Sequence, residues 1–140
     1  MTNINPSVSI ILPTYNRYGY FLERAVQSVI DQSYKNWELI VVDNNSSDGT
    51  LKYLKSIKNN NISILSINND GNIARSRNLG IKNASGDLIA FLDSDDFWER
   101  DKLLSSISFF NKNHEYVGVC HSEYWLSDDI KYVKNYGPES

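Results

Sequence analysis

Short apolar runs alternate with segments of helical periodicity, and this alternation restricts the fold more than any other feature of the sequence. The segment 20–33, for example, carries apolar residues three and four positions apart, which places them on one helical face. Five apolar runs predict buried strands: "VSIILP" (8–13), "WELIVVD" (37–43), "NISILSI" (61–67), "DLIAFLD" (87–93) and "YVGVCHS" (116–122). The resulting β-α-β-α-β-α-β-α-β order favours an α/β fold, a mainly parallel sheet with helices on both faces.

The length and charge of the chain restrict its class further. The 140 residues are enough for one domain with a substantial core, so we expect a single domain over 1–140, with segment 123–140 ambiguous between strand and loop. The net charge of −3 without a Lys/Arg run disfavours nucleic acid as a partner. Because the sequence shows neither a signal-peptide pattern nor an apolar run of about 18–20 residues, we expect a cytoplasmic protein.

Polar and charged residues gather in the loops that follow the first four predicted strands. These loops read "PTYNR", "DNNSSDGT", "NNDGN" and "DSDDFW". In open α/β sheets ligands bind outside the carboxyl ends of the strands. The sequence therefore predicts one composite site built from these four loops.

Several familiar ligand-binding motifs do not match these loops. The first β–α turn, "PTYNRYGYF", contains neither the dinucleotide-binding glycine pattern nor the phosphate-binding loop with its lysine. "DSDDFWERDKLL" fails as a calcium loop because Trp98 replaces the required glycine and Leu104 the final glutamate. "NNSSDGTLKYLK" fails because Lys55 stands at that final glutamate position.

The stretch "FLDSDDFW" places Asp93, Asp95 and Asp96 directly after a buried strand. Three carboxylates within four positions repel one another unless positive charge lies among them. Mg²⁺ and Mn²⁺ take oxygen ligands, typically one or two carboxylates together with substrate phosphates and water. Asp is also a favoured N-cap, so capping of the next helix by Asp95 or Asp96 is the alternative. The clustering favours the cation site.

Three other charged residues have two interpretations each. Asp43 ends a buried strand, where it could accept N–H groups from its own turn or from a nucleobase. Arg75 and Arg77 could be solvated helix charges, or either could neutralise a bound diphosphate through charge-assisted hydrogen bonds.

Taken together, the stretches resemble the family 2 glycosyltransferases, a large inverting group with a GT-A fold. The matching pieces are "VSIILPTYNR", "LERAVQSVIDQSYKNWELIVVDNNSSDGT", "ARSRNLGI", "SGDLIAFLDSDD" and "KL". They occur in the family's order and spacing over about residues 7–122. Each piece is weak alone, but the collinear set is specific.

The resemblance implies a nucleotide-sugar donor site. Its nucleotide pocket would be lined by Pro13, Thr14 and Tyr15, and Asp43 would accept the N–H of the base, usually uracil. Arg77 would lie near the nucleotide or diphosphate. The family commonly has a small residue at the position of Arg75, so either arginine could take the phosphate role; we favour Arg77 because it directly precedes Asn78.

The resemblance also assigns roles within the carboxylate cluster. Asp93 would approach the ribose or sugar, with a share in the metal site. Asp95 would hold Mn²⁺ or Mg²⁺ against the diphosphate. Asp96 matches a third acidic position whose role stays open between support of the site and helix capping.

The implied activity is the metal-assisted transfer of a sugar, with inversion, from a nucleotide-diphosphate donor to a hydroxyl acceptor. A UDP-sugar is the favoured donor, and the acceptor is a saccharide or lipid-linked molecule. The family's catalytic base follows the fifth strand, so we expect it beyond the chain end, and 1–140 to be the weakly active donor-binding portion of a longer catalytic domain. Family members often make surface polysaccharides at the inner membrane face, which extends the expected cytoplasmic location to peripheral membrane association. The alternatives are a non-catalytic nucleotide-binding or assembly domain and, less favoured, a nucleotidyltransferase.

Overall fold

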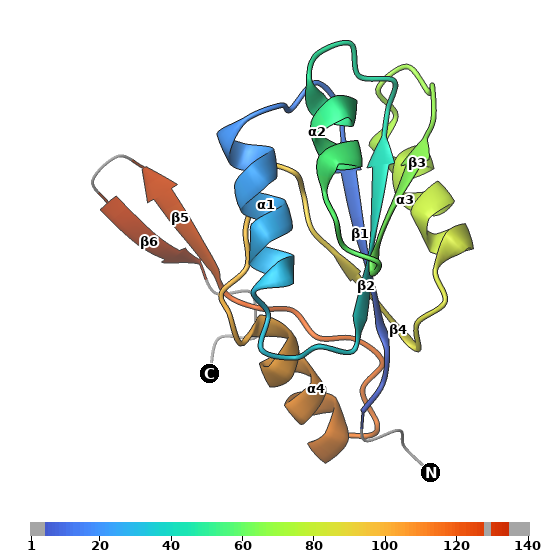
Figure 1. Cartoon of the computed structure of the whole chain (residues 1–140). Helices are drawn as coiled ribbons and strands as arrows, with labels where there is room; N and C mark the ends of the chain where they lie inside the picture. The colour runs from blue at the N-terminus through green and yellow to red at the C-terminus, as the bar shows by residue number, and fades with distance from the viewer. Residues whose placement is uncertain (1–4, 128–129, 135–140) are drawn as a thin grey trace.

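Four parallel strands alternate with four helices in the computed structural model, which describes residues 5–127 and 130–134 (Figure 1). The strands are β1 (Val8–Thr14), β2 (Trp37–Asp43), β3 (Ile62–Ser66) and β4 (Leu88–Phe91). The helices are α1 (Tyr20–Ile30), α2 (Thr50–Ser56), α3 (Ile73–Asn83) and α4 (Lys102–Lys112). The predicted alternation is thus confirmed up to the end of α4.

The sheet has the order β3-β2-β1-β4, so β1 lies in its interior. β1 and β2 pair over seven residues, from Val8 opposite Trp37 to Thr14 opposite Asp43. Every residue of β1 is buried, which explains why its sequence is an almost continuous apolar run rather than an alternating one. The parallel pairing brings the ends of all four strands, and the loops that follow, to one edge of the sheet.

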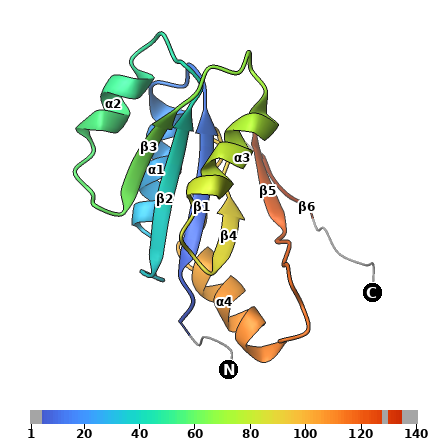
Figure 2. The same cartoon turned by 90° about the vertical axis from the view of Figure 1, so that its right-hand side faces the viewer.

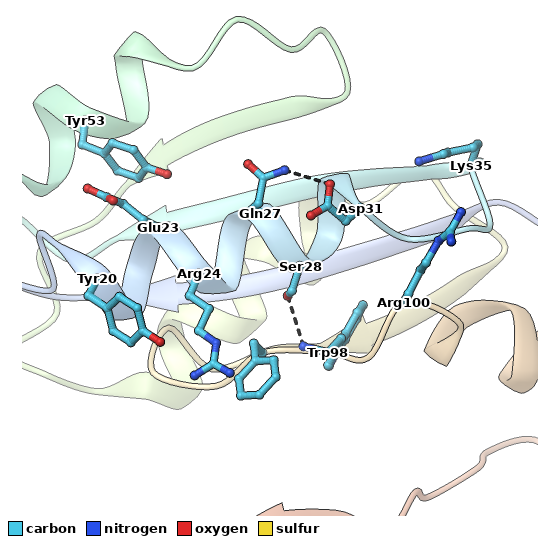
Figure 3. A pocket seen from close by; sticks show the side chains of 11 residues that line it. Tyr20, Glu23, Arg24, Gln27, Ser28, Asp31, Lys35, Tyr53, Trp98 and Arg100 are labelled. Carbon is cyan, nitrogen blue, oxygen red and sulfur yellow. Dashed lines mark hydrogen bonds between the residues drawn. The ribbon is translucent and has the colours of Figure 1, made fainter. Parts of the chain in front are cut away.

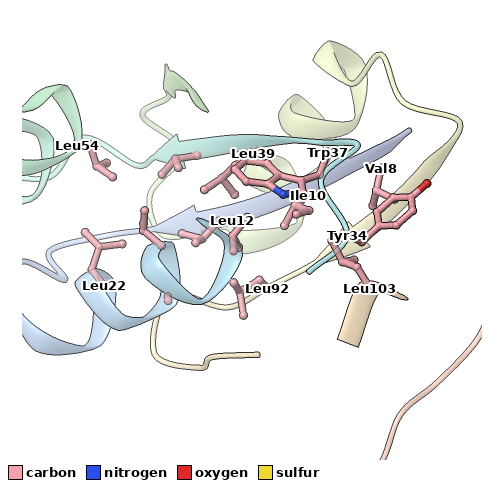
Figure 4. Close-up of a cluster of buried hydrophobic side chains, with 14 of the residues drawn as sticks. Val8, Ile10, Leu12, Leu22, Tyr34, Trp37, Leu39, Leu54, Leu92 and Leu103 are labelled. Atoms are coloured by element: carbon pink, nitrogen blue, oxygen red, sulfur yellow. The ribbon is translucent and has the colours of Figure 1, made fainter. Parts of the chain in front are cut away.

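The two faces of the sheet carry separate apolar clusters. On one face Ile10 and Leu12 of β1 pack with α1, α2 and α4, to which Leu22, Leu54 and Leu103 belong (Figure 4). On the other face a smaller cluster, which includes Ile11, packs against α3. Figure 2 shows α3 on the side of the sheet opposite to α1 and α2, so both faces are covered, as predicted.

The helices follow the predicted apolar spacing. In α1 the buried residues are Leu22, Ala25, Val26 and Val29, which form one stripe. The longest described helices have 11 residues, and none of those described is long and apolar enough to cross a bilayer.

The predicted fifth strand at 116–122 is wrong. This stretch runs as loop, with Val117 and Cys120 exposed and Gly118 in its middle, where it offers no side chain to pack. The strands lie instead in the segment that the sequence leaves ambiguous, where β5 (Glu123–Ser127) and β6 (Ile130–Lys134) form a separate antiparallel hairpin (Figure 1). Among the described residues, no strand therefore pairs with the outer edge of β4.

Candidate active site

The loop after β1 is attached to the loop after β2 by hydrogen bonds that run in both directions. The backbone N–H of Asn16 donates to the Ser46 hydroxyl at 2.9 Å, and the N–H of Ser47 donates to the Asn16 side-chain oxygen at 2.8 Å. The N–H of Arg17 donates to the buried hydroxyl of Thr50 at 2.9 Å. The two loops therefore form one rigid border of the predicted site.

The loop after β3 joins this border through two asparagines. The backbone N–H of Asn69 donates to Asn44 Oδ1 at 3.1 Å, and both residues are buried. Asn69 Nδ2 also donates to the carbonyl of Asn72 and to the Ser76 hydroxyl, each at 2.9 Å. Asn72 is the N-cap of α3, so this network also fixes the start of that helix.

All described residues with positive φ lie in these loops at the carboxyl edge. They are Asn16, Gly19, Asn45, Asp70 and Gly71. Gly, Asn and Asp are the residue types that tolerate the left-handed region, and such conformations cluster at functional sites. The positive φ angles therefore indicate that these loops have a functional role in addition to connecting strands and helices.

Asp43, at the end of β2, is buried and bonded to its own turn. Its Oδ1 accepts from the Ser46 hydroxyl at 2.5 Å, and its Oδ2 accepts from the Ser46 N–H at 3.2 Å. This is the first of the two interpretations given above. Each carboxylate oxygen has a further lone pair, so a nucleobase N–H can still be accepted there.

Two arginines lie against the carboxylate cluster. Arg77 Nη2 donates to Asp93 Oδ1 at 2.7 Å, with the side chains 35% and 43% exposed. Arg17 Nη2 lies 3.6 Å from Asp95 Oδ2, with the side chains 44% and 52% exposed. The positive charge that the acidic stretch requires therefore comes from two separate elements, the loop after β1 and helix α3.

The surroundings of Asp96 disfavour its charged form. Partial burial and the negative charges of Asp95, Asp93 and Glu123 raise the pKa of Asp96 above the usual range of an aspartate. The capping alternative is wrong for both Asp95 and Asp96, because α4 begins only at Lys102 with Asp101 at its N-cap.

The structure separates the two arginines of α3. The Arg75 side chain is exposed, and only its backbone N–H, which donates to Asn72 Oδ1, is part of the loop network. Arg77 instead turns to Asp93, and its guanidinium lies 5.8 Å from the centre of the Phe91 ring. Of the two, only Arg77 reaches the carboxylates in this structure.

The three residues predicted to line a nucleotide pocket have different surroundings. Pro13 and Thr14 are buried at the end of β1, whereas Tyr15 is exposed. Tyr15 borders a cavity of about 290 Å³ between the loops after β1, β2 and β3. The other lining residues of this cavity are Asn44, Asn45, Asn68, Asp70 and Gly71.

Several buried polar atoms at this edge have no hydrogen-bond partner among the described residues. They are Thr14 Oγ1, Asn69 Oδ1 and Arg77 Nε. Thr14 and Asn69 are each only 4% exposed. Because a buried polar atom without a partner is costly, three of them at one sheet edge indicate a place for a polar ligand.

A larger groove of about 950 Å³ lies elsewhere, between the outer side of α1 and segment 97–100 (Figure 3). Its side chains already contact one another: Arg24 lies 3.3 Å from the centre of the Phe97 ring, and Gln27 donates to Asp31 at 2.8 Å. It contains none of the residues that the sequence predicts for the site. We therefore assign the site to the carboxyl edge rather than to this larger groove.

A metal site with three side-chain ligands is not present among the described residues, since no three His, Cys, Asp or Glu side chains gather in that way. Divalent cations at phosphate sites commonly use only one or two carboxylates, with phosphate and water completing the shell. Asp93 and Asp95, in the loop that directly follows β4, supply this set of hard oxygen donors. The residues therefore fit a Mg²⁺ or Mn²⁺ ion that arrives with a phosphate-bearing ligand.

Sequence reasoning missed Arg17, Asn44 and Asn69. Arg17 is part of the quoted "PTYNR" run, but only the fold shows that its side chain reaches Asp95. The two asparagines stand in turn-rich loops, where Asn is common for local reasons alone. The adjacency of the loops after β2 and β3 was the signal that could have found them.

The fold and the charged loops define an α/β protein with a polar site at the carboxyl edge of a parallel sheet. The chain matches the model of the family "Glycosyl transferase family 2" over residues 9–139, and it belongs to that family. The resemblance found in the sequence is thus confirmed.

A relative in Escherichia coli, UDP-Glc:alpha-D-GlcNAc-diphosphoundecaprenol beta-1,3-glucosyltransferase WfgD, is 42% identical over 107 residues. This match covers 76% of the present chain and 42% of the relative. The matched part amounts to between 21% and 49% of the length of four such curated relatives.

Solved structures of glycosyltransferases have the same fold. S. aureus TarS 1-349 in complex with UDP-GlcNAc aligns with a TM-score of 0.72 at 29% identity, over 84% of this chain and 39% of that one. The mannosyltransferase PcManGT from Pyrobaculum calidifontis, in complex with GDP-Man and Mn²⁺, aligns with a TM-score of 0.68 at 25% identity, over 76% and 32%. The predicted GT-A fold is confirmed.

Proposed function

We propose that this chain forms the donor-binding part of a glycosyltransferase that moves a sugar from a nucleotide-diphosphate donor to a hydroxyl acceptor with inversion. The observation that carries the proposal is the set of two arginines and two carboxylates at the carboxyl edge, Arg77 with Asp93 and Arg17 with Asp95. Membership of family 2 supports it.

The proposed donor is a UDP-sugar. Two observations on other proteins support this choice: the name of the E. coli relative specifies UDP-Glc, and TarS was crystallised with UDP-GlcNAc. In this chain the base would enter the 290 Å³ cavity beside Tyr15, whose lining includes Asn44, the residue next to the buried Asp43. A carboxylate accepts from the N–H of uracil, thymine or guanine alike, so the base preference needs to be measured.

The chemical problem of this reaction is the leaving group. Breaking the bond between the anomeric carbon and the diphosphate leaves negative charge on phosphate oxygens. Fixed positive charge in a site shielded from water stabilises that charge far better than water does. Arg77 is suited to this role because the donated hydrogen bond to Asp93 orients its guanidinium, while its Nε, buried and without a partner among the described residues, is left for the ligand.

A divalent cation is part of the proposal, with Asp95 and Asp93 as its protein ligands and Asp96 beside them. When bound, such an ion acts as a Lewis acid that neutralises charge on the departing diphosphate. The PcManGT complex with Mn²⁺ supports this choice of metal. Partial burial, together with the negative charges of Asp95 and Asp93, raises the pKa of Asp96, and this supports a position beside the metal ligands.

We assign no residue of this chain to the acceptor site or to the catalytic base. The name of the E. coli relative specifies a diphosphoundecaprenol-linked sugar, which supports a saccharide or lipid-linked acceptor. Association with the inner membrane face stays a prediction. Inversion follows if the acceptor hydroxyl displaces the diphosphate in a single step with a carboxylate as base. We expect the 140-residue chain by itself to bind the donor but to transfer sugar poorly. Robust sugar transfer by this chain would contradict the proposal that it supplies only the donor-binding part.

Calorimetric titration with UDP, GDP and dTDP, each with and without Mn²⁺, tests the donor site. We expect UDP to bind most tightly and only weakly without Mn²⁺. Asp95→Ala should remove the metal-dependent part of the affinity. Asp101→Ala is the matched control, because it removes the same charge at the N-cap of α4, where the side chain makes no capping bond. Absence of metal-dependent nucleotide binding by the wild-type chain would rule out the proposed donor site.

A further inference from the structure

The two ion pairs of the site differ in strength. Arg77 and Asp93 form a direct hydrogen bond of 2.7 Å, whereas Arg17 and Asp95 lie 3.6 Å apart with about half of each side chain exposed. An exposed pair at this separation contributes little to stability. Of the two arginines, Arg17 is therefore the one whose carboxylate partner is easily replaced.

The backbone of Arg17 is fixed although its side chain is not. Its N–H donates to the buried Thr50 hydroxyl, and Asn16 before it is held in the left-handed region (φ 44°) by bonds to the loop after β2. None of these contacts uses the guanidinium. The side chain can therefore move between partners without any rearrangement of the loop, and its replacement should leave the fold intact.

The charges of the site also favour an exchange of partners. In this structure Arg17 pairs with Asp95, and Arg77 pairs with Asp93. A divalent cation on Asp95 would stand close to the Arg17 guanidinium, and the two positive groups would repel each other. A diphosphate brings negative charge to the same place, and a guanidinium binds phosphate oxygens through charge-assisted hydrogen bonds. The unpartnered buried Thr14 Oγ1 and Arg77 Nε independently indicate that a polar ligand belongs at this edge.

We propose that Arg17 is a donor-phosphate residue that exchanges partners, leaving Asp95 to the cation and moving its guanidinium to the diphosphate. Before the cation binds, Arg17 pairs with Asp95 and so competes weakly with the metal for that carboxylate. This role rests on the proposed function, because it requires a donor with a diphosphate.

The rival explanation is that Arg17 permanently positions Asp95 for the metal. The two explanations predict opposite signs for the binding of Mn²⁺ alone. If Arg17 competes, its loss strengthens Mn²⁺ binding; if it positions the carboxylate, its loss weakens Mn²⁺ binding.

The experiment measures Mn²⁺ binding by electron paramagnetic resonance and UDP binding by calorimetry in saturating Mn²⁺, at low ionic strength. For Arg17→Gln we expect Mn²⁺ alone to bind about two- to fivefold more tightly. We expect UDP in the presence of Mn²⁺ to bind about tenfold more weakly. Arg17→Lys keeps the positive charge and should restore the Mn²⁺ affinity to near the wild-type value.

Arg100→Gln is the matched control, since it removes the same charge from an exposed residue beside the large groove, and it should change neither affinity. Weaker or unchanged binding of Mn²⁺ to Arg17→Gln would overturn the exchange. Equal UDP affinity of wild type and Arg17→Gln would overturn the phosphate role of Arg17 alone. A wild-type chain that binds no UDP with Mn²⁺ would instead overturn the proposed function, and the exchange with it.

Discussion

At the scale of single residues, Glu38 shows how one side chain can hold several segments together. Its Oε1 accepts from the Ser9 hydroxyl at 2.5 Å and from the N–H and hydroxyl of Ser85 at 2.7 and 2.9 Å. It thereby joins β1 and β2 to the segment that precedes β4. Burial acts to raise the pKa of Glu38, but the hydrogen bonds from Ser9, Ser85 and Gly86 outweigh it, so the pKa lies below its usual value of 4.5.

This depressed pKa predicts a pH dependence of stability. Because the folded protein binds the Glu38 proton less readily than the unfolded chain does, the contribution is present above pH 4.5 and is lost as the pH falls through the folded-state value. We expect Glu38→Gln to lower the free energy of unfolding by about 1–2 kcal/mol at pH 7.

Urea unfolding at a series of pH values measures the effect. The difference between wild type and Glu38→Gln should shrink as the solution becomes more acidic. Glu99→Gln, at an exposed position before α4, should be close to wild type throughout. A difference that stays constant down to acid pH would show that the Glu38 contribution does not depend on its charge.

The sequence predicts which residues meet at the site, but not how their side chains pair. Asp43 ends the parallel strand β2 and Asp93 comes shortly after the parallel strand β4, so the strand order alone places both at the same edge of the sheet. The pairing of Arg17 with Asp95 depends on the path of two loops, which no periodicity specifies. Likewise, capping by Asp95 or Asp96 was a reasonable local expectation, and it failed because the chain continues to Asp101 before α4 begins.

At the scale of elements, helix α3 approaches the sheet more closely than an ordinary side chain would allow. A Cβ on Gly80 would lie 2.5 Å from Cγ2 and 3.1 Å from Cδ1 of Ile11, which is completely buried in β1. The close contact keeps α3, and with it Arg77, against the sheet. Gly80 is therefore required by packing, although glycine within a helix costs about 1 kcal/mol relative to alanine.

We expect Gly80→Ala to destabilise the protein by about 1–2 kcal/mol, because overpacking outweighs the gain in helix propensity. In an Ile11→Ala background the obstructing methyl group is gone, so the same change should become neutral or stabilising. Chemical unfolding of the four proteins of this double-mutant cycle measures the reversal. If Gly80→Ala has the same effect in both backgrounds, the close contact with Ile11 is not its cause.

The strands also show that apolar runs alone do not suffice to predict which segments join the sheet. Strands 8–13 and 37–43 were predictable because long, continuously apolar runs fit only the interior of a covered sheet. The run at 116–122 contains Tyr, Val and Cys but also Gly118, His121 and Ser122, and its Val117 is fully exposed. A short apolar run becomes a strand only if an edge lies beside it to pair with, and this depends on tertiary structure rather than on the run itself.

At the scale of the whole molecule, the site is connected to every part of the parallel sheet. Its loops follow β1, β2, β3 and β4, and hydrogen bonds join the first three of these loops to one another. The outer strands β3 and β4 are short and half-exposed, so they are expected to open most readily. A ligand held across the loops should therefore stabilise the domain as a whole, and the outer strands most visibly.

This coupling gives the last prediction. UDP with Mn²⁺ at 100 times its dissociation constant should add about 2.7 kcal/mol to the free energy of unfolding. For a chain of this length, that corresponds to a rise in Tm of about 10 °C. Thermal scans should show the shift growing with the logarithm of the UDP concentration, and hydrogen exchange should slow at the amides of β3 and β4. Asp95→Ala should lose the metal-dependent part of the shift while Asp101→Ala keeps it. Slower exchange confined to the loops, with β3 and β4 unchanged, would mean that the site is anchored to the central strands alone.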